Sequence, residues 1–282
     1  MSVSTIGVIG AGIMGSGIAQ VAASNGIRVL LLDVNERAVS KGIEAVEGRL
    51  NRVVAKGKMT AAEKDAAIRR ITGTTAYDAL KPVDVVIEAA TEDYDLKTKI
   101  FKQVDALARP DSIVASNTSS VSITKLASAM SHPERFVGLH FFNPVPVMPL
   151  VEIVRGLETS DSTHDTAAAL AGQLGKSPIT VKSAPGFVVN RILLPIINEA
   201  FFVLSEGYAS AEDIDKGMKL GCNHPIGPLA LADMIGLDVL LAVMQILHDE
   251  FADSKYRPCP LLKELVAAGH LGRKTGRGVF SY

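Results

Sequence analysis

The sequence predicts an α/β domain with a doubly wound, mostly parallel sheet, followed by an all-helical C-terminal domain. Three observations lead to this prediction. Short continuous Val/Ile/Leu runs alternate with helical patterns along the first two thirds of the chain, as parallel strands covered on both faces do. A Gly-x-Gly-x-x-Gly turn joins the first apolar run to the first helical pattern. After Pro185-Gly186 the apolar segments become long and helical until the last few residues.

Each element is placed from its own pattern. The predicted strands are Ile6–Ile9, Val29–Leu32, Val85–Ala89, Ile113–Ser116, Phe136–His140, Val151–Val154 and Ile179–Val181. The helices between them are Ile13–Ser24, Arg37–Val54, Ala61–Ile71, Leu96–Leu107, Ile123–Ala129 and Thr163–Leu174. The later helices are Phe187–Ser205, Ala211–Leu220, Leu229–His248 and Leu261–Ala268. We therefore expect a dinucleotide-binding domain over residues 1–184 and a helical substrate and dimerisation domain over residues 185–282.

The helix over Phe187–Ser205 is apolar on nearly all sides, and Pro195 should kink it. Such a helix must be buried all round. A helical domain of this size can bury the helix by packing it on a second copy of the chain, which predicts a homodimer. The alternative is burial within a compact core that needs no partner.

Composition excludes several classes of protein. The 282 residues carry a formal net charge of -1, which gives no bulk attraction to nucleic acid or to a membrane surface. Asp233 and Asp238 interrupt the longest apolar stretch, and this argues against a membrane span. The two cysteines, Cys222 and Cys259, form no ligand cluster, so we expect neither a disulfide scaffold nor a metal site. The first strand leaves no room for a signal peptide, and a cytoplasmic location is expected.

The glycine turn predicts a Rossmann-type dinucleotide site. Gly10 would make the tight turn, Gly12 would let the backbone approach a pyrophosphate, and Gly15 would let the helix pack on the strand. Ile13 and Met14 open the helix, whose N-terminus favours phosphate. The alternative is a strand–helix turn with glycines for packing alone.

Asp33 ends the second predicted strand, where a carboxylate would bind both ribose hydroxyls and repel a 2′-phosphate. NAD is therefore favoured over NADP as the cofactor. The alternatives are an ordinary strand end or a helix N-cap, and the nearby Arg37 weakens the preference.

His140 ends a predicted strand, which is where ligands bind in open α/β sheets. Imidazole titrates near neutrality and suits a general base. Glu152 starts the next strand after a proline-rich connection, which would let its carboxylate orient the ring. A structural histidine beside an unrelated glutamate remains the alternative. Ser119 could bond the substrate oxygen or cap a helix, and Asn190 could do so or find partners inside the helical bundle.

Four segments follow one another along the chain: Ser116–Ser120, Gly138–Pro146, Leu150–Glu152 and Pro185–Arg191. Together they resemble the short-chain (S)-3-hydroxyacyl-CoA dehydrogenase family, most closely its bacterial 3-hydroxybutyryl-CoA members. The resemblance extends over nearly the whole chain. It implies interconversion of a 3-hydroxyacyl-CoA and a 3-ketoacyl-CoA, with a C-terminal helical domain that dimerises.

The resemblance also implies roles for particular residues. His140 matches the catalytic histidine and Glu152 its carboxylate partner, while Ser119 and Asn190 match residues that position substrate oxygens. The positions matched near NAD are Glu92, Lys97, Asn117 and Lys274. Two positions depart from the family pattern, Pro149 where lysine is expected and Asn51 where serine is common, and both bear on acyl-CoA binding.

Basic residues on one predicted helix suit the phosphates of CoA. Arg49, Arg52 and Lys56 fall on one helical face and could hold or steer the adenosine phosphate, or form a solvated face. Two other functions stay open at this point, a dehydrogenase acting on a free hydroxy acid and a non-enzymatic nucleotide-binding protein.

Overall fold

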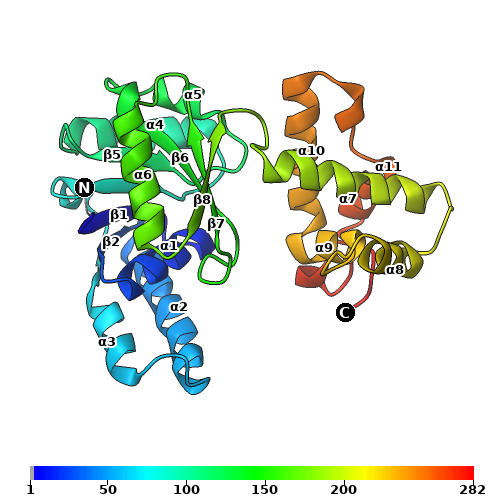
Figure 1. Cartoon of the computed structure of the whole chain (residues 1–282), viewed down its shortest axis with the longest axis horizontal. Helices are drawn as coiled ribbons and strands as arrows, with labels where there is room; N and C mark the ends of the chain where they lie inside the picture. The colour runs from blue at the N-terminus through cyan, green and yellow to red at the C-terminus, as the bar shows by residue number, and fades with distance from the viewer. Residues whose placement is uncertain (1–2) are drawn as a thin grey trace. The chain divides into compact units, whose positions relative to one another are not determined.

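A computed structural model describes residues 3–282 of the protein, so the first two residues of the predicted 1–184 domain lie outside the described residues. The chain divides into two compact units between Ala184 and Pro185 (Figure 1). The first unit contains every strand named below, and the second is helical.

The first unit is built on one eight-stranded sheet with strand order β3-β2-β1-β4-β5-β6-β7-β8. The strands are β1 Thr5–Ile9, β2 Arg28–Leu32, β3 Ile71–Thr74, β4 Val85–Glu88, β5 Ile113–Ser116, β6 Phe136–Phe141, β7 Leu150–Arg155 and β8 Ser177–Lys182. All neighbours pair in parallel except β6 and β7, which are antiparallel. The strand order reverses direction at β1, the arrangement of a doubly wound dinucleotide-binding sheet. The predicted fold class is confirmed.

Helices cover both faces of this sheet. They are α1 Ile13–Ser24, α2 Glu36–Ala55, α3 Ala61–Arg69, α4 Tyr94–Leu107, α5 Ile123–Ala127 and α6 Asp161–Gln173, with 3₁₀ turns at Tyr77–Leu80 and Pro133–Arg135. Ile18 of α1 and Leu170 of α6 share one apolar cluster with the sheet. Phe101 of α4 meets Phe136 of β6 edge-on, with ring centroids 4.7 Å apart. Figure 1 shows α6 in front of the sheet and α4 behind it.

Side-chain caps fix where several of these helices begin. Asn35 caps α2, Asp93 caps α4 and Ser160 caps α6, each through an oxygen that accepts a backbone N–H of the first turn. Thr60 and Glu63 form a reciprocal capping box at the start of α3. These caps satisfy amide groups that the helix itself leaves without partners.

One strand was missed by the sequence prediction. Residue 71 was expected to end a helix, but α3 ends at Arg69, and β3 pairs in parallel with β2 at the edge of the sheet. The segment Ile-Thr-Gly-Thr buries only Ile71 and so lacks the apolar run that marks the inner strands. An edge strand needs little apolar surface because one side of it faces no neighbour.

The second unit is an all-helical bundle. Its helices are α7 Val189–Ser205, α8 Ala211–Gly221, α9 Pro228–Ile235, α10 Leu237–Phe251 and α11 Pro260–Ala267, with 3₁₀ turns at Ser254–Tyr256 and Arg273–Thr275. Its core gathers apolar side chains from four of these helices, including Phe201, Leu229, Met244 and Leu262.

The single helix predicted over Leu229–His248 is wrong. The chain turns by 99° between α9 and α10. Gly236 at this break has a φ of 104°, a left-handed conformation that favours glycine. Within residues 3–282, no single helix is long and apolar enough to cross a membrane, and this bent pair passes only by its combined length and composition.

Helix α7 is less buried within its unit than the sequence predicted. Leu194, Ile197 and Phe201 enter the core, but Ile192 is 59% exposed and Ile196 38% exposed. Pro195 lies inside the helix, as expected from its place in the sequence. The bundle alone therefore does not cover one apolar side of α7.

Candidate active site

The glycine turn after β1 has the local geometry of a nucleotide-binding loop. Gly10 has a φ of 100°, and a Cβ there would lie 2.6 Å from the Ala89 carbonyl oxygen. A Cβ on Gly15 would lie 1.7 Å from the carbonyl oxygen of Gly10, so α1 packs directly against the turn. A Cβ on Gly12 would meet nothing within 4 Å. The turn is therefore closed toward the protein and open at Gly12, which fits the dinucleotide that the sequence predicts.

Asp33 ties the end of β2 to this turn. Its Oδ2 accepts the Ala11 N–H at 2.7 Å, and its Oδ1 accepts the Val34 N–H. The N-cap of α2 is Asn35, so the alternative in which Asp33 caps that helix does not hold. Asp33 stands at the carboxyl end of β2, where a ribose-binding carboxylate is expected.

His140 and Glu152 meet across the antiparallel pair β6 and β7. The two residues are direct partners in the strand register, and His140 Nδ1 lies 2.7 Å from Glu152 Oε2. The His140 side chain is 7% exposed and that of Glu152 is completely buried. A buried carboxylate at this distance accepts the Nδ1 proton, which makes Nε2 the basic nitrogen of the ring.

The segment that joins β6 to β7 is held by a lysine from elsewhere in the unit. It contains a cis peptide bond between Asn143 and Pro144. The Lys176 ammonium donates to the carbonyl oxygens of Val145, at 2.5 Å, and Met148, at 2.8 Å. Burial lowers the pKa of Lys176. Near Pro149, where the sequence resemblance leads us to expect a lysine, this chain thus has a positive charge supplied by Lys176.

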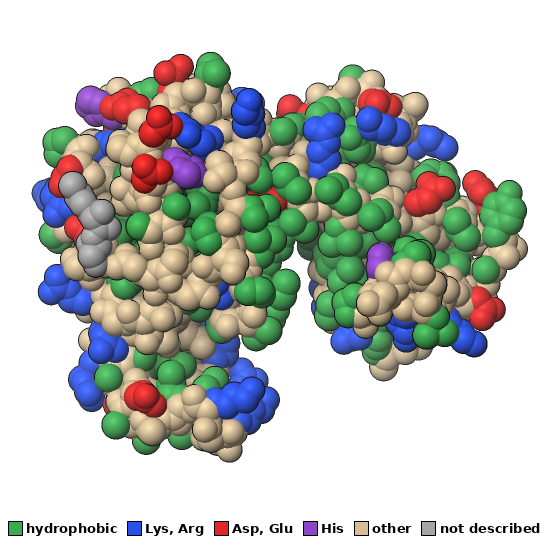
Figure 2. Space-filling model, viewed as in Figure 1, with side chains coloured by type: hydrophobic (Ala, Val, Ile, Leu, Met, Phe, Trp, Pro, Cys, Tyr) green, Lys and Arg blue, Asp and Glu red, His purple; other side chains and the backbone are tan. Residues whose placement is uncertain are grey.

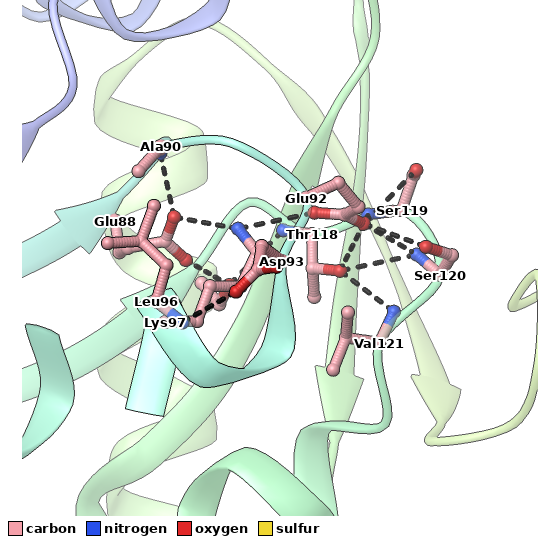
Figure 3. Close-up of polar contacts among 11 residues, drawn as sticks. Glu88, Ala90, Glu92, Asp93, Leu96, Lys97, Thr118, Ser119, Ser120 and Val121 are labelled. Atoms are coloured by element: carbon pink, nitrogen blue, oxygen red, sulfur yellow. Dashed lines mark hydrogen bonds and ion pairs between the residues drawn. The ribbon is translucent and has the colours of Figure 1, made fainter. Parts of the chain in front are cut away.

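Glu92 organises the turn that follows β5. Its Oε1 accepts the backbone N–H groups of Ser119, at 2.9 Å, and Ser120, at 3.1 Å, and the hydroxyl of Thr118 at 2.5 Å. Burial by itself would raise the Glu92 pKa, but the Lys97 ammonium and these donors outweigh it and hold the pKa below its usual value. The turn that carries Ser119 is therefore anchored on an ionised carboxylate (Figure 3).

Asn117 joins the carboxyl ends of β5 and β6. Its side-chain oxygen accepts the Phe141 N–H at 2.9 Å, and its own N–H donates to the Glu88 carbonyl oxygen at 2.7 Å. The residue therefore lies between the Ser119 turn and the strand that carries His140.

Glu88 is a functional candidate that the sequence analysis missed. It ends β4, is completely buried, and accepts the Lys97 ammonium at 2.7 Å (Figure 3). In the sequence it lies within the strand predicted over Val85–Ala89 and was not separated from the other residues of that strand. The available signal was a carboxylate at the carboxyl end of an otherwise apolar strand beside the glycine turn.

The comparisons with known proteins agree with this geometry. The family model described as "3-hydroxyacyl-CoA dehydrogenase, NAD binding domain" matches residues 5–184, and the model of the C-terminal domain of the same family matches residues 186–282. The chain belongs to the 3-hydroxyacyl-CoA dehydrogenase family.

Relatives resemble this dehydrogenase over its whole length. A 3-hydroxybutyryl-CoA dehydrogenase of Bradyrhizobium diazoefficiens is 51% identical over 99% of this chain and 96% of its own. A probable 3-hydroxybutyryl-CoA dehydrogenase of Bacillus subtilis is 50% identical over 100% of this chain and 98% of its own.

Solved structures give the same picture. The (S)-3-hydroxybutyryl-CoA dehydrogenase of Ralstonia eutropha is 63% identical, with a TM-score of 0.97 over 100% of this chain and 99% of its own. A Mycobacterium tuberculosis protein, FadB2, is 42% identical, with a TM-score of 0.98 over 100% of both chains. The expected family and an NAD-binding domain are confirmed.

Two expected site residues of this dehydrogenase belong to the second unit. Asn190 is half-buried in the first turn of α7. The Lys274 ammonium lies 2.6 Å from Asp238 of α10. Burial by itself would raise the Asp238 pKa, but Lys274 reverses that effect and lowers it. The observed contact of Lys274 is thus an ion pair within its own unit.

The basic face expected on α2 is only partly available to a ligand. Arg49 turns toward α1, where it donates to Gln20 at 2.6 Å and to the Ser16 hydroxyl at 3.0 Å. Arg52 and Lys56 are exposed. Asn51 is exposed and accepts from the Lys64 ammonium at 3.2 Å. Figure 2 shows basic side chains gathered over α2 and α3.

Within residues 3–282, no group of three or more His, Cys, Asp or Glu side chains has a metal-binding arrangement.

Proposed function

We propose that this dehydrogenase interconverts (S)-3-hydroxyacyl-CoA and 3-ketoacyl-CoA thioesters, with 3-hydroxybutyryl-CoA and acetoacetyl-CoA as its substrate pair. The observation that carries the proposal is the contact between His140 and Glu152 at the carboxyl end of β6, in a chain with the NAD-binding domain of this family. The names of the relatives favour the four-carbon substrate.

In the proposed reaction His140 handles the proton of the substrate hydroxyl. When the alcohol is oxidised, Nε2 takes that proton, and the Glu152 carboxylate stabilises the imidazolium that forms. In the reverse direction the same nitrogen returns the proton to the keto oxygen. NAD supplies the hydride chemistry, and the Gly10–Gly15 turn, Asp33, Glu92, Asn117 and Lys274 are the residues proposed to hold it. The buried Lys97 is proposed to act on the cofactor site through its contact with Glu92.

Five further residues are proposed to bind the substrate. Ser119 and Asn190 would position the reacting oxygen, Ser119 from the turn that Glu92 anchors. Arg52 and Lys56 are exposed cations suited to the phosphates of CoA. Asn51 lies on the same helix and is proposed as a neighbouring polar contact.

The test is NADH consumption with acetoacetyl-CoA, longer 3-ketoacyl-CoA thioesters and free acetoacetate. The proposal expects turnover of the thioesters, fastest with acetoacetyl-CoA, and a loss of about 10²–10⁴ in turnover for His140→Ala. His132→Ala is the matched control, because His132 is an exposed histidine that pairs with the nearby Glu134. A preference for free acetoacetate, or normal turnover in folded His140→Ala, would reject the proposal.

The dehydrogenase is also proposed to form a homodimer through its helical unit. Several large apolar side chains of this unit are exposed, namely Ile192, Ile196, Met234 and Val239. Ile192 and Ile196 lie four residues apart on one side of α7, and Figure 2 shows hydrophobic side chains gathered on this unit. Burying such a surface against a second copy follows from the hydrophobic effect.

Sedimentation equilibrium tests this proposal. The unmodified chain should sediment as a dimer, and Ile192→Asp should shift it toward the monomer, while Leu157→Asp, at an exposed apolar residue of the first unit, should not. A monomer at all concentrations would contradict it.

A cytoplasmic location is proposed as well, since both cysteines are free thiols, Cys222 exposed and Cys259 buried.

A further inference from the structure

Glu88 is an ionisable side chain enclosed completely within the first unit. Removing a carboxylate from water is strongly unfavourable unless partners compensate. Its Oε1 accepts the Ala90 N–H at 2.7 Å and the Lys97 ammonium at 2.7 Å, and its Oε2 accepts the Ser116 hydroxyl at 2.6 Å. Three donors, from the turn after β4, from α4 and from β5, therefore meet on one buried carboxylate.

Lys97 connects this carboxylate to Glu92. Its side chain is 1% exposed, and its ammonium lies 3.2 Å from Glu92 Oε2 as well as 2.7 Å from Glu88. The other oxygen of Glu92 binds the turn after β5. Figure 3 shows the resulting series of contacts, which runs from Glu88 through Lys97 and Glu92 to Ser119 and Ser120.

A second route reaches the same turn through Ser116. The Ser116 hydroxyl donates to Glu88 and accepts the Thr118 N–H at 3.2 Å. The Glu92 route ends on the N–H groups of the next two residues, Ser119 and Ser120. Three consecutive amide groups of the turn are thus connected to one buried carboxylate.

The buried charges at this place call for a reason besides stability. Replacing a buried ion pair by apolar groups is often neutral or stabilising, so three charged groups are not needed to hold the strands together. At the other end of β5 the Ser112 hydroxyl donates to the Val83 carbonyl oxygen at 2.6 Å, and the ion pair there, between Asp84 and Arg109, is partly exposed rather than buried. The charged network lies at the carboxyl ends of β4 and β5, the side on which ligands bind.

We propose that Glu88 is a positioning residue for the dehydrogenase reaction. It holds Lys97 and Ser116, through them the Glu92 carboxylate and the 118–120 turn, and thereby the Ser119 hydroxyl. The proposal rests on the substrate-binding role proposed above for Ser119. Glu88 itself is enclosed by protein and does not touch the substrate.

The experiment compares Glu88→Gln with Asp84→Asn. Glu88 is the last residue of β4, and Asp84 stands directly before its first residue. At that opposite end Asp84 accepts the Ser4 and Thr5 N–H groups and the Arg109 guanidinium. Amide hydrogen exchange is measured on the whole chain without cofactor or substrate, together with kcat on acetoacetyl-CoA at saturating NADH. Peptides covering residues 117–122 report on the turn.

We expect Glu88→Gln to speed exchange in residues 117–122 by about tenfold and to lower kcat by about tenfold, as the loss of a charged hydrogen bond implies. Asp84→Asn should speed exchange only around residues 4 and 5, lower the melting temperature and leave kcat unchanged. Unchanged exchange in 117–122, or an equal loss of kcat in both variants, would overturn the proposal.

A second pair of variants keeps the test decisive if Glu88→Gln does not fold. Ser116→Ala removes one donor to Glu88, and Ser112→Ala removes the matching hydroxyl at the other end of β5. Only Ser116→Ala should loosen the turn and lower kcat, and equal effects would overturn the proposal. The exchange measurement involves no reaction, so failure of the proposed function, seen as normal turnover in His140→Ala, is a separate result.

Discussion

His140 and Glu152 face each other across two adjacent antiparallel strands, with 2.7 Å between Nδ1 and Oε2. The contact is built from backbone pairing, because the strand register places the two residues opposite each other. Both side chains are buried, so water competes little for the hydrogen bond. The ring is therefore fixed in orientation before any ligand binds.

Glu152→Gln tests what that contact does in the reaction. An amide keeps the shape but removes the charge that is proposed to stabilise the imidazolium and to fix the tautomer. We expect kcat to fall by about 10²–10⁴ with little change in KM for acetoacetyl-CoA. Glu158→Gln, at an exposed glutamate after β7, should behave as the unmodified enzyme. A kcat for Glu152→Gln within a factor of three of the unmodified enzyme would remove Glu152 from the mechanism.

Asp33→Asn tests the choice between NAD and NADP. The substitution removes the negative charge that would repel a 2′-phosphate and weakens the bond to the Ala11 N–H. The KM for NADH should rise about tenfold or more, and the ratio of kcat/KM for NADPH to that for NADH should increase. Glu36→Gln, an exposed carboxylate three residues further on, is the control. An unchanged ratio would show that Asp33 does not set the preference.

Substitution of two glycines of the first turn by alanine should affect different properties, the stability of the fold for Gly15 and cofactor binding for Gly12. In Gly15→Ala the new methyl group would lie 1.7 Å from the Gly10 carbonyl oxygen, so we expect destabilisation of about 1–3 kcal/mol. In Gly12→Ala the methyl group meets nothing within 4 Å, so the melting temperature should stay unchanged while the dissociation constant for NADH rises. Unchanged NADH binding in Gly12→Ala would mean that the cofactor does not approach this part of the turn.

The lowered pKa of Glu92 predicts a pH dependence with a definite sign. A carboxylate whose pKa is lower in the folded state stabilises the fold above its unfolded pKa, about 4.3 for glutamate, and loses that effect as the pH falls through the folded value. The melting temperature of Glu92→Gln should therefore lie below that of the unmodified chain at neutral pH, and the gap should close in acid. A gap that widens below pH 4.3 would contradict the assignment.

The sequence predicted the elements whose signals are local. The inner strands are continuous apolar runs, and the glycine turn has a fixed spacing, so both could be placed before the structure was known. The approach of Glu152 to His140 was expected from a stiff proline-rich connection, whereas the structure achieves it by antiparallel pairing of β6 and β7. The short separation of the two residues in the sequence indicated that they could meet. The physical cause of their contact is the antiparallel pairing of β6 and β7.

Other features depend on contacts that no local pattern records. Strand β3 has only Ile71 buried, so nothing in its sequence distinguishes it from the end of a helix. The turn at Gly236 interrupts an apolar run that is helical on both sides. Glu88 gains its importance from Lys97 and Ser116, which come from other elements of the fold. Long-range polar partners of this kind become visible only in three dimensions.

The segment that joins β6 to β7 is held by contacts of its own. Its ends are fixed by the strand ladder and its middle by Lys176, while the histidine and glutamate stay paired through their own strands. Substitutions in residues 143–149 therefore leave in place the strand register that pairs His140 with Glu152, whereas Phe142 packs on the His140 ring with centroids 4.5 Å apart. In this dehydrogenase, the connection between the two strands can change in sequence while the buried pair keeps its position.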